Sequence, residues 1–409
     1  MQEYWIAGAR VVDGVSTEPQ DGLDIHVVDG RITALGRTPQ GAHIVDASGL
    51  TITPGLIDAH VHFGMSTDID PSLRREISVA ELAADMFANC EETLNGGFTT
   101  VRDTGGIDGG LAQVVASGKV KGPRIIQCGP IQCQTGGHGH LAAEWEPTAD
   151  WSDHDIPGLR ALSLLSDGPE EVRKNVRESF RRGADFIKMC VTGGVVSTHD
   201  KLSDTQFAFS EIAAAVEEAA ARGTYVTVHA HNNAGLRTAI EAGVKCVEHG
   251  TEIDDEMAAI MAERGVAHVP TLAVVQKLSR SATEAGLSVA MASRVGDAMA
   301  GQRRAIVASR AAGVKVGLGS DLIGPLQSDR GIELTLRAEI ETPMLALHSA
   351  TRINAEILGI ADEVGTIEVG KRADLVGFAA DPIENPKIFG DREMVRLVVQ
   401  NGRLARDTR

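Results

Sequence analysis

The chain is poor in cysteine and in aromatic residues, and it is short of positive charge. Among 409 residues there are five cysteines and 3% aromatics, and 39 basic residues stand against 56 acidic ones, which gives a formal net charge of −17 at pH 7. No Cys-x-x-Cys pair occurs, which argues against a disulfide framework and for a reducing compartment. A surface this acidic repels phosphate backbones and anionic membranes, so neither nucleic acid nor membrane is an expected partner.

Long apolar runs are also missing. No stretch of about 20 apolar residues occurs, so no membrane-spanning helix is expected. The opening residues, MQEYWIAGAR, carry neither the basic nor the apolar region of a secretory signal peptide. We therefore expect a cytoplasmic protein, with a chain long enough for one large domain and one small one.

Both ends of the chain have the character of short strands. WIAGARVVDG and LDIHVVDGRITALG near the start carry Asp-Gly pairs, and VRLVVQNGRL near the end carries Asn401-Gly402, and such pairs favour tight hairpin turns. The two ends share this pattern of short strands, and the residues between them do not. We expect a small β-sandwich domain built from residues 1–55 and 363–409, with residues 56–362 inserted into it.

The middle of the chain alternates strands and helices. SEIAAAVEEAAARG and NAGLRTAIEAG show the three- and four-residue apolar spacing of helices. Eight such strands over about 300 residues predict an α/β fold, a (β/α)8 TIM barrel. A doubly wound open sheet is the alternative, but no Gly-x-Gly-x-x-Gly follows the first strand. The predicted strands are GLIDAHVH, FTTVRDTG, RIIQCGPIQ, ADFIKMCVTG, YVTVHAHN, CVEHGTE, AHVPTLA and VKVGLGSD.

Ionisable residues stand at the ends of five of these strands. In a barrel the carboxyl ends of the strands meet at one mouth, where catalytic residues gather. Each histidine alone is more simply a structural residue, and a lone Asp a helix cap. Their equivalent positions instead predict a shared site for zinc or a similar divalent ion. These residues are His60, His62, Lys188, His229, His231, His249 and Asp321.

Lys188 needs a separate explanation. A protonated ammonium next to a divalent cation is repelled, so its charged form is disfavoured there. The amine either stays neutral or reacts with CO2 to give an anionic carbamate that can bridge two metals. A salt-bridged lysine turned away from the site is the structural alternative.

In combination these motifs resemble the amidohydrolase superfamily, and specifically its two-metal imidazolonepropionase-like and prolidase-like branch. PGLIDAHVHFG, ADFIKMCVTGGV, VTVHAH, VEHG, GLGSD and GTIEVGKRADLVGF carry the resemblance, which covers nearly the whole chain. It implies that His60, His62 and Asp321 hold one metal, and that His229 and His249 hold the second. A carbamate on Lys188 and a hydroxide would bridge the two ions, with zinc the expected metal.

The resemblance also implies the reaction. Asp321 would take a proton from the bridging water and pass it to the leaving amine. TGGHGH resembles the branch's substrate-contact loop, so His140, His138 and His231 are candidate substrate-binding residues, with His140 and His231 also candidate catalytic residues. The expected activity is release of a C-terminal amino acid from a dipeptide or N-acyl amino acid, as in a prolidase or carboxypeptidase. The resemblance further suggests a homo-oligomer, with an octamer as one form.

Three alternatives stay open. The same binuclear site would suit hydrolysis of a cyclic amide, a carbamate or a xenobiotic amide. A scaffold protein without catalysis would be expected to lack metal ligands, yet all six are present. A single-metal deaminase leaves Lys188 unexplained, and the acid expected after the first strand-five histidine is missing. The leaving group is not encoded in these motifs, although Trp145 and Trp151 are candidates for stacking on a flat ring.

Overall fold

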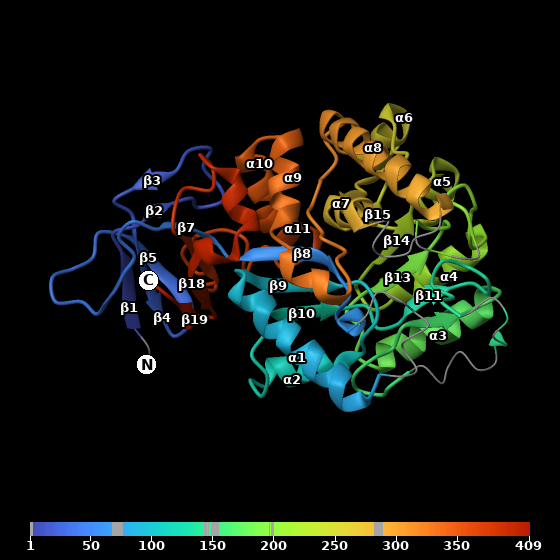
Figure 1. The fold of residues 1–409 in the computed structure, drawn as a ribbon, viewed down its shortest axis with the longest axis horizontal. Coiled ribbons are helices and arrows are strands. Elements are labelled where there is room, and N and C mark those ends of the chain that lie inside the picture. The colour runs from blue at the N-terminus through green and yellow to red at the C-terminus, as the bar shows by residue number, and fades with distance from the viewer. Residues whose placement is uncertain are drawn as a thin grey trace.

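The computed structural model describes residues 3–67, 77–142, 145, 147–148, 155–195, 197, 200–281 and 289–409. It is an α/β protein with parallel sheets (Figure 1). Strands from both ends of the chain, blue and red, lie together at one end of the molecule, where both termini are found. Helices surround the parallel strands in the rest of the molecule.

Two sheets in the middle of the chain are wholly parallel. One has the order β10-β9-β8 and the other the order β12-β11-β13-β14-β15-β16. Parallel sheets with both faces covered have near-continuous apolar strands. The strands are β8 (Leu56–Val61), β9 (Phe98–Asp103), β10 (Arg124–Gln127), β11 (Ile131–Cys133), β12 (Ser163–Leu165), β13 (Ile187–Cys190), β14 (Val226–Ala230), β15 (Cys246–His249) and β16 (Ala267–Val269).

The helices pack around these strands. The two helices expected from apolar spacing are present as α4 and α5. The α-helices of the described chain are α1 (Val79–Asn95), α2 (Gly109–Ala116), α3 (Pro169–Arg181), α4 (Phe209–Ala220), α5 (Asn233–Ala242), α6 (Asp255–Arg264), α7 (Leu272–Ser281), α8 (Val289–Ala311), α9 (Ile332–Ile340), α10 (Pro343–His348) and α11 (Asn354–Ile357). Ser78 and Asp254 cap α1 and α6 by accepting hydrogen bonds from backbone N–H groups of the first turn.

The largest described apolar cluster lies between the strands and their helices. Ile187, Val228 and Val247 from three neighbouring strands pack there against Leu236 and Ile240 of α5, and all five are buried. Each such side chain contributes about 1.5–3 kcal/mol by leaving water. This packing holds the strands rigidly, and so fixes the side chains at their carboxyl ends.

Two predicted strands differ in the structure. RIIQCGPIQ is split into β10 and β11, because Gly129 adopts a left-handed φ of 71° and Pro130 follows it. VKVGLGSD forms no regular strand, although Val316 makes a parallel bridge to His268. This segment still lies beside β8, since Ala59 N–H donates to Leu318 O and Asp321 N–H donates to His60 O, both at 2.9 Å.

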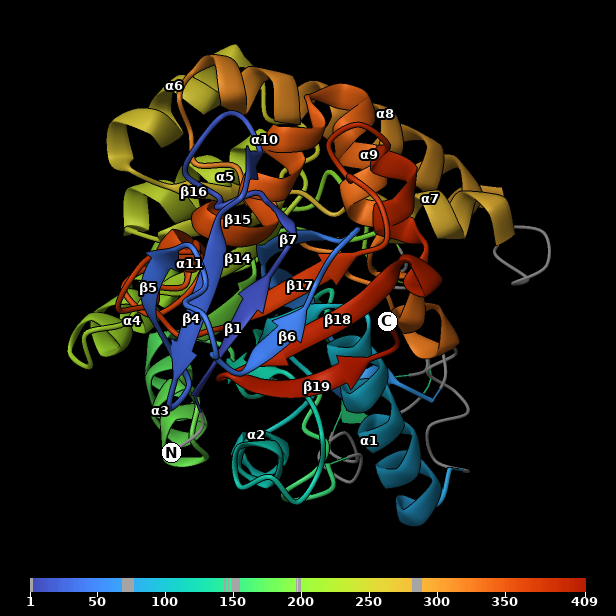
Figure 2. The ribbon, with the colours of Figure 1, turned by 90° about the vertical axis from the view of Figure 1, so that its left-hand side faces the viewer.

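The terminal segments form two further sheets (Figure 2). The first sheet has the strand order β5-β4-β1-β6 and contains only N-terminal residues. The second has the order β19-β18-β17-β7-β2-β3 and combines strands from both ends of the chain, with β17 antiparallel to β7. Their bounds are β1 (Glu3–Ala7), β2 (Arg10–Val11), β3 (Gln20–Asp21), β4 (Asp24–Val28), β5 (Arg31–Gly36), β6 (Ile44–Asp46), β7 (Thr51–Pro54), β17 (Leu375–Phe378), β18 (Val395–Gln400) and β19 (Arg403–Asp407).

One apolar cluster draws on both terminal sheets. Ile6 and Ile25 come from the first sheet, and Ile52, Leu375 and Leu397 come from the second. Strands that are far apart in the sequence therefore share a core. Among the described helices, none is both long enough and apolar enough to cross a membrane.

Candidate metal centre

The predicted site residues lie at the carboxyl ends of neighbouring strands. Lys188 lies within β13, His229 within β14, and His249 is the last residue of β15. The strand register pairs Cys190 with His229 and Ala230 with His249, so these ends lie at one edge of the sheet. His60 belongs to β8, and His62 follows that strand.

A first group of donor atoms centres on Asp321. Its Oδ1 lies 3.3 Å from His60 Nε2 and 3.2 Å from His62 Nε2, and its Oδ2 lies 3.8 Å from His249 Nδ1. The Nδ1 of His62 donates to Gly105 O at 2.7 Å, which leaves its Nε2 free to act as a ligand atom. Three ligand atoms lie within 4.8 Å of one another, as in a metal site, one from each of His60, His249 and Asp321.

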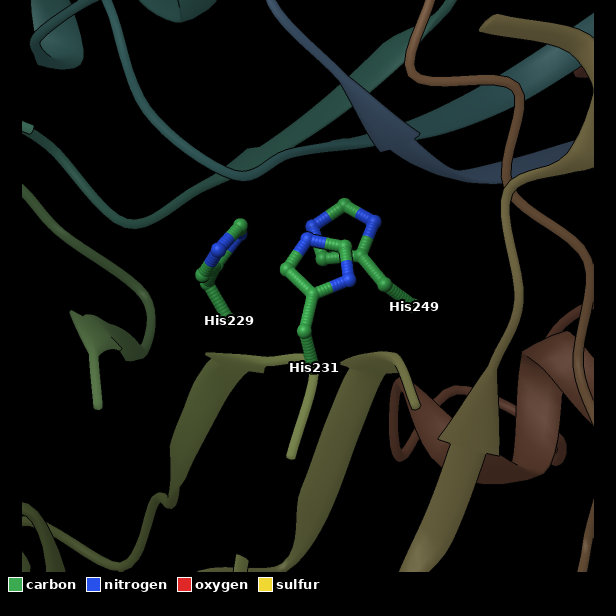
Figure 3. Close-up of side chains that lie close together, drawn as sticks. All are labelled: His229, His231 and His249. Atoms are coloured by element: carbon green, nitrogen blue, oxygen red, sulfur yellow. The ribbon is translucent and has the colours of Figure 1, made fainter. Parts of the chain in front are cut away.

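A second group consists of three imidazoles (Figure 3). His229, His231 and His249 each offer a ring nitrogen within 4.8 Å of the others. The His231 and His249 rings are stacked with centroids 5.1 Å apart, and His229 meets both edge-on. His249 belongs to both groups, so the two candidate sites are contiguous. His231, expected to contact substrate, thus lies among the candidate ligands.

The charge states of these side chains favour the binding of a cation. Burial lowers the pKa of His231 to about 3, and burial together with neighbouring positive charges holds the pKa of His229 and His249 well below the ordinary value. Burial raises the pKa of Asp321, but the neighbouring imidazoles of His60, His62 and His249 outweigh burial and hold that pKa well below its ordinary value. Neutral imidazoles beside an anionic carboxylate are the donor set that zinc and similar ions prefer.

Lys188 is buried, with 2% of its surface exposed. Its positive charge lowers the pKa of His60, His229 and His249, so it lies within electrostatic range of both groups. For His60 this effect is smaller than that of Asp321, and its pKa is raised overall even though burial lowers it.

Backbone strain marks two of the candidate ligands. His249 has a φ of 66° and Asp321 a φ of 55°, both in the left-handed region that residues other than glycine seldom adopt. Residues are held in such conformations mainly at functional sites, where the surrounding structure imposes them. The donor set and this strain together fit a bound divalent ion.

The TGGHGH loop lies against the cluster through His138. Its ring stacks on the His229 ring with centroids 4.1 Å apart, and its Nδ1 is buried without a hydrogen-bond partner among the described residues. His140 Nδ1 instead accepts a hydrogen bond from Gly136 N–H, within its own loop. Of the tryptophans considered for stacking, Trp145 is 88% exposed and Trp151 lies outside the described residues.

Several polar partners of the site were not singled out in the sequence. His60 Nδ1 lies 2.8 Å from Glu248 Oε2, His231 Nδ1 lies 2.7 Å from Thr251 Oγ1, and His249 Nδ1 lies 2.8 Å from Thr271 Oγ1. Glu248 stands inside the VEHG motif, directly before His249. Its position in a buried strand was the one available signal, because a fully buried glutamate needs a partner.

Comparison with known proteins places these motifs in a family. The Amidohydrolase family model matches residues 51–405. Ochratoxinase from Aspergillus niger is 31% identical over 376 residues, which cover 90% of this chain and 77% of that protein.

Solved structures of prolidases are also similar to this chain. A prolidase in complex with N-methylphosphonate-L-proline is 33% identical with a TM-score of 0.93, and the alignment covers 99% of this chain and 100% of that one. A Xaa-Pro dipeptidase with methionine bound in its active site is 30% identical with a TM-score of 0.88, over 98% of this chain and 99% of that one. The chain belongs to the amidohydrolase family, and it is a hydrolase that acts on amide bonds.

Proposed function

We propose that this enzyme releases a C-terminal amino acid from a dipeptide or an N-acyl amino acid. The observation that carries the proposal is the pair of ligand groups sharing His249, in a chain so similar to a prolidase over its whole length. Water adds across the amide, giving a carboxylic acid and the free amino acid.

The roles of the residues follow their positions. His60, His62 and Asp321 would hold one divalent ion, and His229 and His249 a second, with zinc the preferred metal. Lys188 would bridge both as a carbamate, formed when its neutral amine adds to CO2 and loses a proton. When bound, two such ions would polarise the amide carbonyl and make a water nucleophilic at neutral pH.

Asp321 would move the proton. Its carboxylate is anionic at neutral pH, since its pKa is held well below the ordinary value by His60 and His62 despite burial. It can therefore accept a proton from the attacking water and deliver it to the leaving nitrogen, which must be protonated to depart as an amine.

The substrate would be oriented by histidines beside the cluster. His140 is proposed to contact the scissile carbonyl or the substrate carboxylate, with His138 and His231 as further contacts. The stacking of His138 on His229 and its unpartnered Nδ1 support a role in binding for His138. His231 is close enough to the ligands to orient either substrate or metal.

We also propose the architecture that holds this site. The two parallel sheets would be arcs of a (β/α)8 barrel spanning residues 56–362, joined on one side by residues 314–321 through hydrogen bonds to β8 and β16. Asp185 N–H donates to Gln127 O at 2.8 Å, which supports closure on the other side. The shared core of the terminal sheets supports a β-sandwich from residues 1–55 and 363–409.

The test is amine release from a panel of dipeptides, N-acyl amino acids and cyclic amides by enzyme loaded with zinc in bicarbonate buffer. Each N-acyl amino acid is paired with its carboxamide, which has the same amide bond but no free carboxylate. We expect turnover only of linear substrates with a free carboxylate. Equal turnover of the carboxamides, or of cyclic amides alone, would contradict the proposal.

A second candidate is hydrolysis of a xenobiotic amide on the same centre. The similarity to ochratoxinase, over 90% of this chain, favours it over a cyclic amide or a carbamate. Amides of bulky aromatic acids with a simple amine, which has no carboxylate, separate the two candidates. Turnover of these amides, with no turnover of dipeptides, would select the second.

A further inference from the structure

Glu248 is a buried carboxylate whose two oxygens face different partners. It is fully buried on β15, and its Oε2 lies 2.8 Å from His60 Nδ1. Its Oε1 accepts from Arg102 Nη2 at 2.6 Å, from the Thr227 hydroxyl, and weakly from the Cys246 thiol at 3.7 Å. One oxygen therefore faces the candidate metal ligand, and the other faces only donors.

Arg102 is fixed as the counter-charge. Its guanidinium is fully buried, its Nε donates to Ala59 O at 2.6 Å, and it lies 5.5 Å from the centre of the Phe186 ring. Arg102 and Glu248 form a fully buried ion pair, with Arg102 Nη2 2.6 Å from Glu248 Oε1, and a guanidinium that stays charged keeps the carboxylate beside it ionised. An ionised carboxylate has no proton to donate, so the hydrogen on the His60–Glu248 contact belongs to His60.

We infer that Glu248, held ionised by Arg102, is a positioning residue that keeps the ring proton of His60 on Nδ1. The other nitrogen, Nε2, lies 3.3 Å from Asp321 Oδ1 and 3.2 Å from His62 Nε2, and its lone pair is then available for a cation shared with these atoms. A metal-ligating histidine needs this arrangement, in which the distal nitrogen donates and the proximal one is unprotonated. The inference rests on the proposed function through the assignment of His60 as a ligand.

The Glu248→Gln variant reverses this arrangement without changing the shape of the side chain. The three donors near Oε1 would attract the amide oxygen, so the amide NH2 group would point at His60 Nδ1. That nitrogen must then accept, and the ring proton moves to Nε2, where it blocks the ligand position. We expect zinc affinity to fall about 10- to 100-fold.

The direct test is the tautomer of His60 in the intact enzyme. Protein labelled with ¹⁵N-histidine gives long-range proton–nitrogen correlations, and the His60→Gln variant identifies the His60 signals. In the wild type we expect a protonated Nδ1, and an Nε2 that shifts when zinc is added. In Glu248→Gln we expect the proton on Nε2, together with weaker zinc binding in a competition titration with a chelator.

Two further variants control the result. Glu248→Asp keeps the negative charge and should keep the proton on Nδ1. Glu3→Gln makes the same chemical change at a surface pair, where Glu3 Oε1 lies 3.1 Å from His26 Nε2, and should leave zinc affinity unchanged.

The outcomes separate the inference from its premise. An unprotonated Nδ1 in wild-type His60, or a Glu248→Gln variant with unchanged zinc affinity, would overturn the role of Glu248. If the ¹⁵N signal of His60 Nε2 does not shift when zinc is added, His60 is not a ligand. That result would overturn the ligand assignment of the proposed function, and the inference with it. If Glu248→Gln fails to fold, the wild-type spectrum alone decides.

Discussion

At the scale of single residues, the site combines the neutral imidazoles of His229 and His249 with the anionic carboxylate of Asp321. Burial disfavours charge on these two histidines, while neighbouring imidazoles favour it on Asp321. Lys188 is the exception, because it is buried beside the candidate ligands and a charged ammonium there would repel a bound metal ion. Conversion of its amine to a carbamate would replace a positive charge with a negative one. This difference makes Lys188 the most informative single residue to change.

Lys188→Ala is expected to abolish turnover and to lower the zinc content from two ions per chain, because the bridging ligand is lost. Metal analysis and amine release measure both effects. For the wild type, activity regained on adding zinc to metal-free enzyme should depend on bicarbonate. Lys245→Ala, at an exposed position just before β15, is the matched control and should behave as wild type. Full turnover of Lys188→Ala would rule out the two-metal scheme.

His140→Asn tests recognition of the substrate carboxylate. A hydrogen bond to a charged group contributes about 1.5–3 kcal/mol, so KM for an N-acyl amino acid should rise about 10- to 100-fold. The carboxamide analogue is not expected to be cleaved, so its binding is measured as the inhibition constant Ki, which should not change. Steady-state kinetics gives the KM of the acid and the Ki of the carboxamide, with the exposed His43→Asn as control. Equal changes in KM and Ki would assign His140 to the carbonyl instead.

The sequence predicted the candidate ligands because their positions depend only on strand ends. His60, His229 and His249 each close an apolar run, and parallel strands bring such ends together. Glu248 and Thr271 could not be predicted as partners, since those contacts depend on how side chains of neighbouring segments pack against one another. The substrate contact expected of His231 stays a prediction. Its stacking on His249, within the group of candidate ligands, is a tertiary contact that the sequence does not show.

At the scale of elements, glycine shapes the segment that replaces the eighth predicted strand. A Cβ added at Gly319 would lie 2.4 Å from His60 Cβ, so only glycine allows this segment to approach β8 so closely. The sequence showed apolar alternation in VKVGLGSD but not this close approach. The helices α4 and α5 were predictable, because their apolar periodicity is local.

Gly319→Ala should therefore push His60 from its position. We expect a loss of about 1–3 kcal/mol in the free energy of unfolding, as for other overpacked sites, and weaker zinc binding. Urea denaturation and a zinc titration measure the two effects. Gly296→Ala is the matched control, because Gly296 lies in α8 with no atom within 4 Å of the added Cβ. That control should be stabilised by up to about 1 kcal/mol. An unchanged Gly319→Ala protein would contradict the packing described.

At the scale of the whole molecule, one buried acid links separate elements and should influence stability. Glu333 in α9 is fully buried, and its Oε2 accepts from Ala273 N–H of α7 at 2.6 Å. Burial raises the pKa of Glu333 to about 8, and the charge of Arg337 offsets this only in part. The folded protein thus holds a proton that the unfolded chain releases near its ordinary pKa of 4.5.

Because the unfolded chain binds fewer protons between these values, stability should fall as the pH rises from about 4.5 to about 8. Glu333→Gln has no proton to lose and should lack this component of the pH dependence. The measurement is the difference in unfolding free energy between wild type and variant across that range. A difference that stays constant with pH would show that Glu333 is ionised in the folded protein.

The pairing of Pro54 in β7 with Leu375 in β17 has a consequence for synthesis of the chain. At roughly 5–20 residues per second, a ribosome needs tens of seconds to make what lies between them. During that time β7 has an open edge on its β17 side, and open edges are prone to pair with other chains. Residues between β7 and β17 can fold during this time. The C-terminal strands would then pair with β7 last and complete the sheet that combines both ends of the chain.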